Sequence, residues 1–324
     1  MELANRVNLD FDQALHLGDI KFTSDKILKE FEYIYFLSNA EAALFSNVKY
    51  DEDYLSYLVS KGFTPQKIVN KCKHYINWWG NLDNIEIARV RNSKIVNTEW
   101  AIENKFCPSS VKVVNNEKEL NQYREGHKDN KFYYRSEFGF SGISNKILDG
   151  TKNYSLRYPG VVAQYLNIVF SFGVTVNLET MDYYMVENII DENGRFRGGM
   201  ISEWKEIAKQ LSISNEEFSK ELSEIFQKLR VRFGAVILQF DSLLYWKDGK
   251  VLWYKVVEIN YRRTMGHIIK CLYDKFGPGE WIFDQVDKVE TYQKLEKSLS
   301  KKYSSKLIIT SPKHTKILSY YRYK

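Results

Sequence analysis

The chain has 324 residues, more than a single domain usually contains, and this length predicts two or three domains with a large buried core. Hydrophobic residues make up 44% and charged residues 27%, while Gly and Pro are scarce, so the composition excludes a disordered or fibrous chain. The formal charge of +6 suits anionic ligands. The one dense basic cluster lies near the C-terminus and fits a solvated face, so nucleic-acid binding is disfavoured.

The cysteines and the hydropathy of the chain indicate in which cellular compartment the protein occurs. Cys72, Cys107 and Cys271 are odd in number and lack metal-ligand spacing, so neither a disulfide framework nor a zinc site is expected. Residues 1–12 contain no apolar signal segment, and no stretch approaches 18 uninterrupted apolar residues. We therefore expect a cytoplasmic protein that does not span a membrane.

The N-terminal part reads as an α/β domain over residues 1–85. The apolar run 31–37 predicts a buried strand, and residues 51–60 predict a helix. A helix-like pattern follows Pro65 as far as residue 73, and the segment Trp78-Trp79-Gly80 ends it. A domain boundary near residue 85 follows from this break.

Residues 86–166 read as a small α+β lid. Helical patterns cover 92–105 and begin again at residue 117, and strand patterns cover 111–114, 132–134 and 161–166. A glycine-rich turn over 139–142 separates the second and third of these strands.

Residues 167–324 predict an antiparallel sheet with helices. Ser214 and Glu217 form a capping box for a helix that reaches residue 230. Residues 235–246 and 251–259 then predict two strands, joined by a tight turn at Asp248-Gly249. The overall fold class is therefore α/β, with α+β character in the lid.

The end of this hairpin carries a cluster of oxygen ligands. Strand alternation places Glu258 and Asn260 on one face. A two-residue turn at Asp248-Gly249 would pair Asp241 with residue 256, which leaves Asp241 diagonal to Glu258 on the same face. Two carboxylates and an amide oxygen suit Mg²⁺. The alternative is an ordinary solvent-exposed face of an antiparallel sheet.

The cluster belongs to a longer pattern. Asp241, followed by Glu258-Ile259-Asn260-Tyr261-Arg262, resembles the metal-binding strand pair and Glu-x-Asn-x-Arg signature of the ATP-grasp superfamily. The resemblance implies that Asp241, Glu258 and Asn260 hold one or two Mg²⁺ with ATP, and that Arg262 steadies the acyl-phosphate or the acid substrate. Arg263 is adjacent and is a second catalytic candidate, although it lies outside the matched pattern.

Nucleotide-binding candidates occur in the order that the family shows. Asn92-Ser93-Lys94 resembles its Asn-Asp-Lys lid motif, with Lys94 on nucleotide phosphate and Ser93 in place of Asp. Arg135 stands on the lid strand where the family has Lys, and the loop with Gly139, Ser141 and Gly142 resembles its glycine-rich loop. A surface lysine and a hairpin turn are the structural alternatives.

The segment 161–166 resembles the hinge strand that meets adenine, so Gln164, Tyr165 and Leu166 are candidate nucleotide contacts. Gln164 replaces the Glu of many members, and an amide still hydrogen-bonds an adenine edge. The resemblance spans residues 90–268, about half of the chain.

The implied activity is that of an ATP-dependent, ADP-forming carboxylate–amine ligase that works through an acyl-phosphate. Its partners would be a small-molecule carboxylate and an amine or peptide substrate, and a homodimer is left open. Two alternatives remain: a small-molecule kinase on the same fold, and a regulator that binds nucleotide without turnover. No general base is assigned, and His267 reads as structural.

Overall fold

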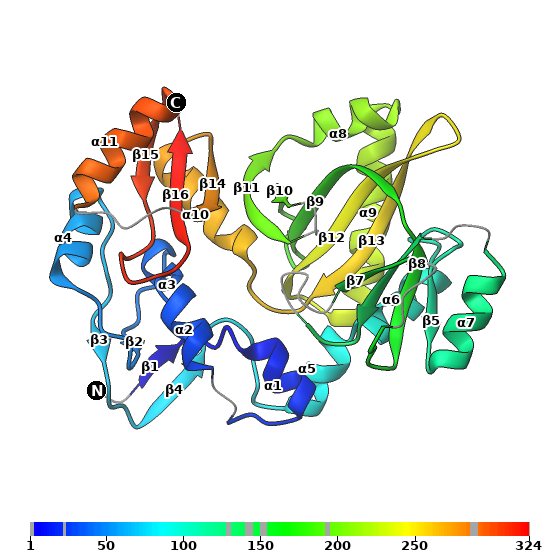
Figure 1. Ribbon diagram of the computed structural model, residues 1–324, viewed down its shortest axis with the longest axis horizontal. Coiled ribbons are helices and arrows are strands. Elements are labelled where there is room, and N and C mark those ends of the chain that lie inside the picture. The colour runs from blue at the N-terminus through cyan, green and yellow to red at the C-terminus, as the bar shows by residue number, and fades with distance from the viewer. Residues whose placement is uncertain are drawn as a thin grey trace.

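The computed structural model describes residues 3–21, 24–127, 131–139, 145–149, 154–191, 195–285 and 291–323. These residues form three sheets: a parallel sheet of order β3-β2-β1-β4, an antiparallel sheet of order β5-β8-β6-β7, and an eight-stranded antiparallel sheet of order β13-β12-β9-β10-β11-β14-β16-β15 (Figure 1). The predicted α/β class, with an N-terminal α/β part, a small α+β lid and an antiparallel C-terminal sheet with helices, is confirmed.

The N-terminal segment differs from the prediction in two places. Residues 31–37 are the end of one helix and a second short helix rather than a strand, because an unbroken apolar run is buried on every side in either conformation. The expected helix after Pro65 is absent, and a two-residue parallel strand pairs with residues 44–45 instead.

The helices and strands of the N-terminal segment are β1 (Leu3–Arg6), α1 (Phe11–Leu17), α2 (Asp25–Phe31), α3 (Ile34–Leu37), β2 (Leu44–Phe45), α4 (Glu52–Ser60), β3 (Ile68–Val69) and β4 (His74–Asn77).

The lid sheet has its own small core. Leu120 and Tyr123 of one helix pack on Phe132, Tyr134 and Val162 of the sheet. This part of the chain contains α5 (Ile85–Asn92), α6 (Lys94–Glu103), β5 (Lys112–Val114), α7 (Glu117–Glu125), β6 (Lys131–Ser136), β7 (Asn145–Asp149) and β8 (Gly160–Gln164). The helix and strands predicted between residues 92 and 164 are confirmed.

The large sheet is covered by different helices at its two ends. The elements are β9 (Asn167–Asn177), β10 (Tyr183–Ile190), β11 (Phe196–Ser202), α8 (Trp204–Leu211), α9 (Asn215–Phe233), β12 (Ile237–Lys247), β13 (Lys250–Asn260), α10 (Met265–Phe276), β14 (Gly279–Asp284), α11 (Tyr292–Tyr303), β15 (Lys306–Ile309) and β16 (Leu318–Tyr323). Helices α8 and α9 pack on β9, β10, β12 and β13, through Phe218, Leu222 and Leu229 among others.

The C-terminal elements complete the N-terminal part of the molecule. Strands β14 to β16 and helices α10 and α11 share one hydrophobic core with α1, α3 and α4, and Trp281, Tyr321 and Phe36 lie in it. Figure 1 shows these elements side by side, with both termini in this half. Sequence analysis assigned no role to residues 269–324. The division of the chain at residues 85 and 166 stays a prediction.

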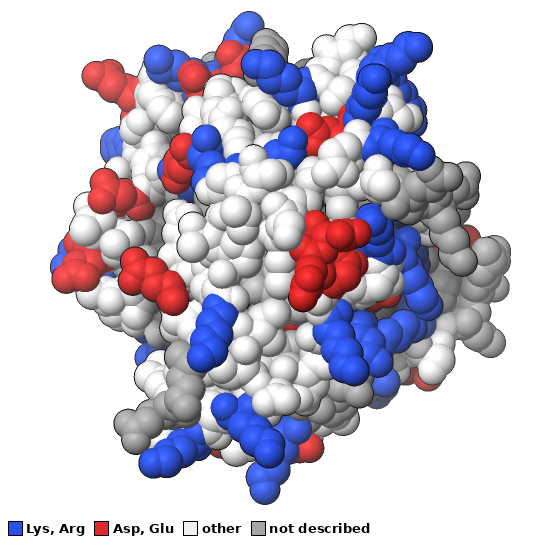
Figure 2. All heavy atoms as spheres, turned by 90° about the vertical axis from the view of Figure 1, so that its left-hand side faces the viewer, with Lys and Arg blue, Asp and Glu red and all other residues white. Residues whose placement is uncertain are grey.

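The outer face of this half carries mixed charge. Figure 2, which views it from the side of α4 and α11, shows acidic and basic side chains interspersed around a neutral area. Lys313 illustrates the mixing, because its Nζ lies 3.8 Å from Asp53. This fits the solvated face that the sequence predicted for the C-terminal lysines. No helix among the described residues is long and apolar enough to cross a membrane.

The cap of α9 gives a stability prediction. The Ser214 hydroxyl accepts the Glu217 backbone N–H at 3.1 Å, as the capping box predicts. Ser214→Ala should lower the free energy of unfolding in urea by about 1 kcal/mol, because that N–H loses its protein acceptor. Ser219→Ala, inside the same helix, should be neutral or stabilising by about 0.5 kcal/mol or less. Equal effects of the two changes would contradict a capping role.

Candidate functional site

The site begins with the hairpin of β12 and β13. Asp248 and Gly249 both have positive φ, 50° and 77°, as a two-residue hairpin turn requires. Pairing follows the predicted register from Lys247↔Lys250 as far as Leu243↔Tyr254, and then shifts. Beyond the shift Asp241 pairs with Glu258, so the predicted pairing with residue 256 is wrong. Two additional residues in β13 form a bulge that brings the two carboxylates directly opposite each other.

Groups from three segments satisfy the backbone of this bulge. The Ser242 hydroxyl donates to the Lys255 carbonyl, the Val256 N–H donates to the Phe106 carbonyl at 3.0 Å, and Arg135 Nη1 donates to the Val257 carbonyl at 2.8 Å. Arg135 is buried. The lid strand β6 is therefore attached to β13 at the bulge, and this guanidinium, which the resemblance assigns to phosphate, contacts backbone in this structure.

Two amides hold the Asp241 carboxylate. Asn260 Nδ2 donates to Asp241 Oδ2 at 3.1 Å, and Gln239 Nε2 donates to Asp241 Oδ1 at 2.8 Å. The hydroxyls of Thr175 and Thr264 donate to Gln239 Oε1, which fixes the orientation of that amide. Sequence analysis missed Gln239, although its place two residues before Asp241 on the same strand face could have indicated it.

Gly173 on β9 permits this close arrangement. It pairs with Asp241, and a Cβ at this position would lie 2.5 Å from Gln239 Nε2 and 3.2 Å from Asp241 Oδ1. Only glycine leaves room for the amide and carboxylate above the neighbouring strand.

The cluster has the electrostatics of a cation site. Burial, followed by repulsion from Glu258, raises the pKa of Asp241 to about 6. Asn260 uses its Nδ2 to donate to Asp241, so the amide oxygen Oδ1 is the atom of this side chain that could bind a cation. Two opposed carboxylates and an amide oxygen fit Mg²⁺, because a divalent cation would remove the repulsion. The cluster has only two carboxylates, and no group of three His, Cys, Asp or Glu that could hold a metal gathers anywhere in the described ranges.

Lys94 provides positive charge beside these ligands. It is buried, its Nζ lies 3.0 Å from Glu258 Oε1, and it donates to the Gly139 carbonyl at 2.7 Å. Ser93 is the N-cap residue of α6: its hydroxyl accepts the Val96 N–H at 3.2 Å and donates to Glu137 at 2.7 Å. The structure thus brings the lid motif to the carboxylate cluster.

The two arginines after β13 have different environments. Arg262 Nη2 lies 3.1 Å from Asp12 Oδ2, and the guanidinium lies over the Trp79 ring at 5.8 Å. Arg263 donates to the Trp78 carbonyl and lies over the Trp78 ring at 5.1 Å, so it fixes the loop after β4. The catalytic roles suggested for Arg262 and Arg263 by the sequence stay predictions.

His267 has the character of a structural residue. Burial, together with the Arg263 charge, lowers its pKa to about 4, so the ring is neutral at pH 7. Its Nε2 lies 3.9 Å from Cys271 Sγ, one turn further along α10.

The hinge candidates follow the lid sheet. The Tyr165 N–H donates to the Lys131 carbonyl at 3.1 Å, and the Lys131 ammonium lies 4.6 Å from the Tyr165 ring centroid. Leu166 packs beside Ile95, Tyr245 and Tyr254, between α6 and the hairpin. Gln164 ends β8. Ser141 and Gly142 lie outside the described residues, so only Gly139 of the predicted loop is placed.

The fold has counterparts among solved structures. The ADP complex of N5-carboxyaminoimidazole synthetase from Staphylococcus aureus covers 99% of this chain and 85% of its own, at 12% identity and a TM-score of 0.50. The ADP complex of an N5-carboxyaminoimidazole ribonucleotide synthetase covers 99% and 92%, at 8% identity and a TM-score of 0.51. These are ATP-grasp enzymes.

The chain has the ATP-grasp fold. This confirms the fold that the resemblance implied. No family model and no curated protein matches the sequence. At identities of 8–12% the likeness establishes the fold and leaves the reaction to be argued from the residues.

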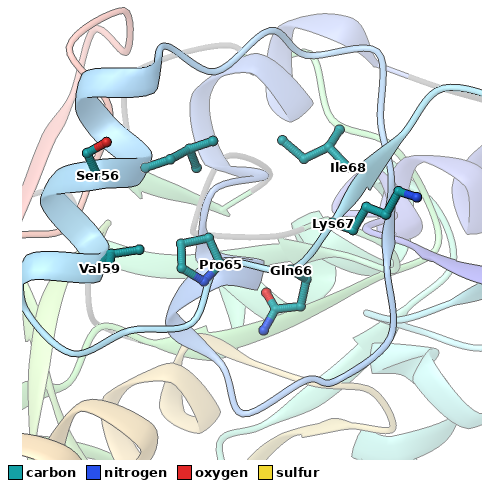
Figure 3. A pocket seen from close by; sticks show the side chains of 7 residues that line it. Ser56, Val59, Pro65, Gln66, Lys67 and Ile68 are labelled. Atoms are coloured by element: carbon teal, nitrogen blue, oxygen red, sulfur yellow. The ribbon is translucent and has the colours of Figure 1, made fainter.

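A separate pocket of about 480 Å³ opens between α4 and β3 (Figure 3). It is lined by Leu55, Ser56, Val59, Pro65, Gln66, Lys67 and Ile68. None of the predicted site residues lines it. The carboxylate cluster, and not this pocket, therefore stays the candidate functional site.

Asp241 gives a pH prediction. Its folded pKa of about 6 exceeds the ordinary value of 3.8, so its contribution to stability is present below about pH 4 and is lost as the pH rises through 6. Metal-free Asp241→Asn protein does not lose stability in this way, because the amide side chain carries no proton that is released in this pH range. Relative to wild type, its free energy of unfolding should rise between pH 4 and pH 7 by on the order of 2–3 kcal/mol.

Urea denaturation at the two pH values measures this difference, and saturating Mg²⁺ at pH 7 should reduce it by stabilising the wild type alone. A difference between the two proteins that does not change with pH would show that Asp241 is not held in a repulsive, desolvated environment.

Proposed function

We propose that this protein is an ATP-dependent, ADP-forming ligase that joins a small-molecule carboxylate to an amine through an acyl-phosphate. The observation that carries the proposal is the direct pairing of Asp241 with Glu258, with Asn260 beside them, on one face of an ATP-grasp sheet. The fold likeness to ADP-bound synthetases supports a nucleotide at this position. An amino acid or peptide remains our candidate for the amine partner.

The reaction balances as two displacements. A carboxylate oxygen of the acid takes the γ-phosphoryl group of ATP and releases ADP. The amine nitrogen then attacks the acyl carbon, phosphate leaves, and the nitrogen loses a proton. Bound Mg²⁺ would neutralise charge on the phosphates during transfer.

The residues of this chain would bind and orient the reactants. Asp241, Glu258 and Asn260 would hold the metal, and Lys94, which already lies against Glu258, would turn its ammonium to a phosphate oxygen. Arg262 would take an oxygen of the acid. Lid strand β6, attached to β13 through Arg135, would limit the entry of water to the acyl-phosphate.

One observation favours a second candidate, a regulator that binds nucleotide without turnover. The Arg135 guanidinium donates to the Val257 carbonyl and lies 3.4 Å from the Tyr254 hydroxyl, whereas a phosphate-binding cation would present its donors to the ligand. The two functions differ in ADP release, which only the ligase shows in the presence of its acid.

Glu258→Gln tests the proposal. The change keeps the size of the side chain and removes one charge, so Mg²⁺-dependent ADP release, found first by a screen of small carboxylic acids with amino acids and peptides, should fall at least a hundredfold. Some stability should also be lost, because the buried Lys94 loses its carboxylate partner.

The matched control is Glu221→Gln. Glu221 on α9 also pairs with a lysine of β13, Lys255, at 3.1 Å, and its loss should leave ADP release unchanged. A Glu258→Gln protein that remains folded and retains wild-type ADP release would remove the metal site from the account.

A further inference from the structure

The Arg262 guanidinium pairs with a carboxylate from a distant part of the chain. Its Nη2 is 3.1 Å from Asp12 Oδ2, and the two side chains are only 8% and 9% exposed. Arg262 also follows Asn260 by two residues, and Asn260 contacts Asp241 at 3.1 Å, so the Arg262 charge acts on Asp241 as well and opposes the rise of its pKa. Arg262 can therefore pair with Asp12 or turn to the proposed metal ligand.

The polar atoms of this pair are incompletely satisfied. Arg262 Nη1 donates to the Arg263 carbonyl at 3.2 Å, but Nε is buried and has no hydrogen-bond partner among the described residues. Asp12 Oδ2 is likewise buried, with the ion contact to Arg262 and no aligned hydrogen bond. A buried unmade hydrogen bond costs about 1–3 kcal/mol, so an unpartnered Nε indicates an acceptor brought by a ligand.

The segment that carries Asp12 is held firmly. Asn8 Oδ1 accepts the N–H groups of Trp79 and Gly80 at 3.0 and 3.3 Å, and its Nδ2 donates to the Gly80 carbonyl at 2.8 Å. A Cβ on Gly80 would lie 2.6 Å from the Phe11 ring. The start of α1 and the loop after β4 are thus locked together, with Asp12 on one side of Arg262 and the Trp79 ring near it.

The other end of Arg262 is fixed through its neighbour. The Tyr261 N–H donates to Asn92 Oδ1 at 2.9 Å, and Arg91 donates to the Tyr261 hydroxyl at 2.6 Å. The backbone before Arg262 is therefore constrained by α5, and Asp12 sets the direction of the side chain.

We propose that Asp12 is a positioning residue for Arg262. Asp12 holds the guanidinium off Asp241, so that this carboxylate stays open to the metal–nucleotide complex and Nε stays free for an oxygen of the acid substrate. Without the Asp12 charge, Arg262 pairs with Asp241 and competes with the metal. The inference rests on the proposed function, because it assigns Asp241 to the metal.

Binding of the Mn²⁺ complex of a non-hydrolysable ATP analogue, followed by water-proton relaxation, tests this assignment. Asp12→Asn should weaken binding about tenfold, because the guanidinium moves to Asp241. Asp12→Glu should keep most of the affinity. The double variant Asp12→Asn/Arg262→Met should regain wild-type affinity, because the competing cation is gone. A merely structural role of Asp12 predicts no such recovery.

Asp10→Asn is the matched control. Asp10 is buried in the same segment, accepts the Ser24 N–H at 2.7 Å and lies 3.8 Å from Arg6, so its loss should lower stability and leave Mn²⁺–nucleotide affinity unchanged. Unchanged affinity of Asp12→Asn, or a double variant as weak as the single one, would overturn the inference. Failure of the wild type itself to bind, or equal binding by Glu258→Gln, would instead overturn the proposed function.

Discussion

The bulge in β13 is the constraint on which the candidate site depends. In a regular ladder Asp241 would face residue 256, and Glu258 would lie on the diagonal; two additional residues bring the carboxylates opposite each other. Such a shift leaves backbone groups without ladder partners, and Ser242, Phe106 and Arg135 supply them. The geometry of the metal ligands is therefore coupled to the lid through Arg135.

Charge balance explains why the rest of the site is built as it is. Two facing carboxylates repel, and the structure offsets this repulsion with Lys94 at Glu258 and with amide donors at Asp241. Arg262 adds a cation that Asp12 holds from the N-terminal segment. The N-terminal helix α1, the lid region and the large sheet thus each contribute a charged group, and a change in one affects the others.

The sequence predicted those parts of the molecule that depend on local pattern. The cap at Ser214, the turn at Asp248-Gly249 and the two long strands follow from residue chemistry at fixed spacing, and each is confirmed. The ATP-grasp fold followed from the order of motifs. The apolar run 31–37 was misassigned, because residues buried on every side carry no period that separates helix from strand.

Contacts between residues that are distant along the chain could not be predicted from the sequence. The bulge has no marker of its own, because its stability comes from Phe106 and Arg135, which are distant along the chain. Asp12 became visible only through its contact with Arg262, which lies 250 residues further along the chain. The last two strands of the large sheet, which pack with α3 and α4, were unassigned for the same reason.

The central claim is that the bulge creates a divalent-cation site between Asp241 and Glu258. A crystal structure of the protein with Mn²⁺ and a non-hydrolysable ATP analogue, using anomalous scattering from manganese, tests it directly. The account predicts a manganese peak between these two carboxylates, with Asn260 Oδ1 and phosphate oxygens as further ligands. A nucleotide bound elsewhere, or a peak that neither carboxylate contacts, would contradict it.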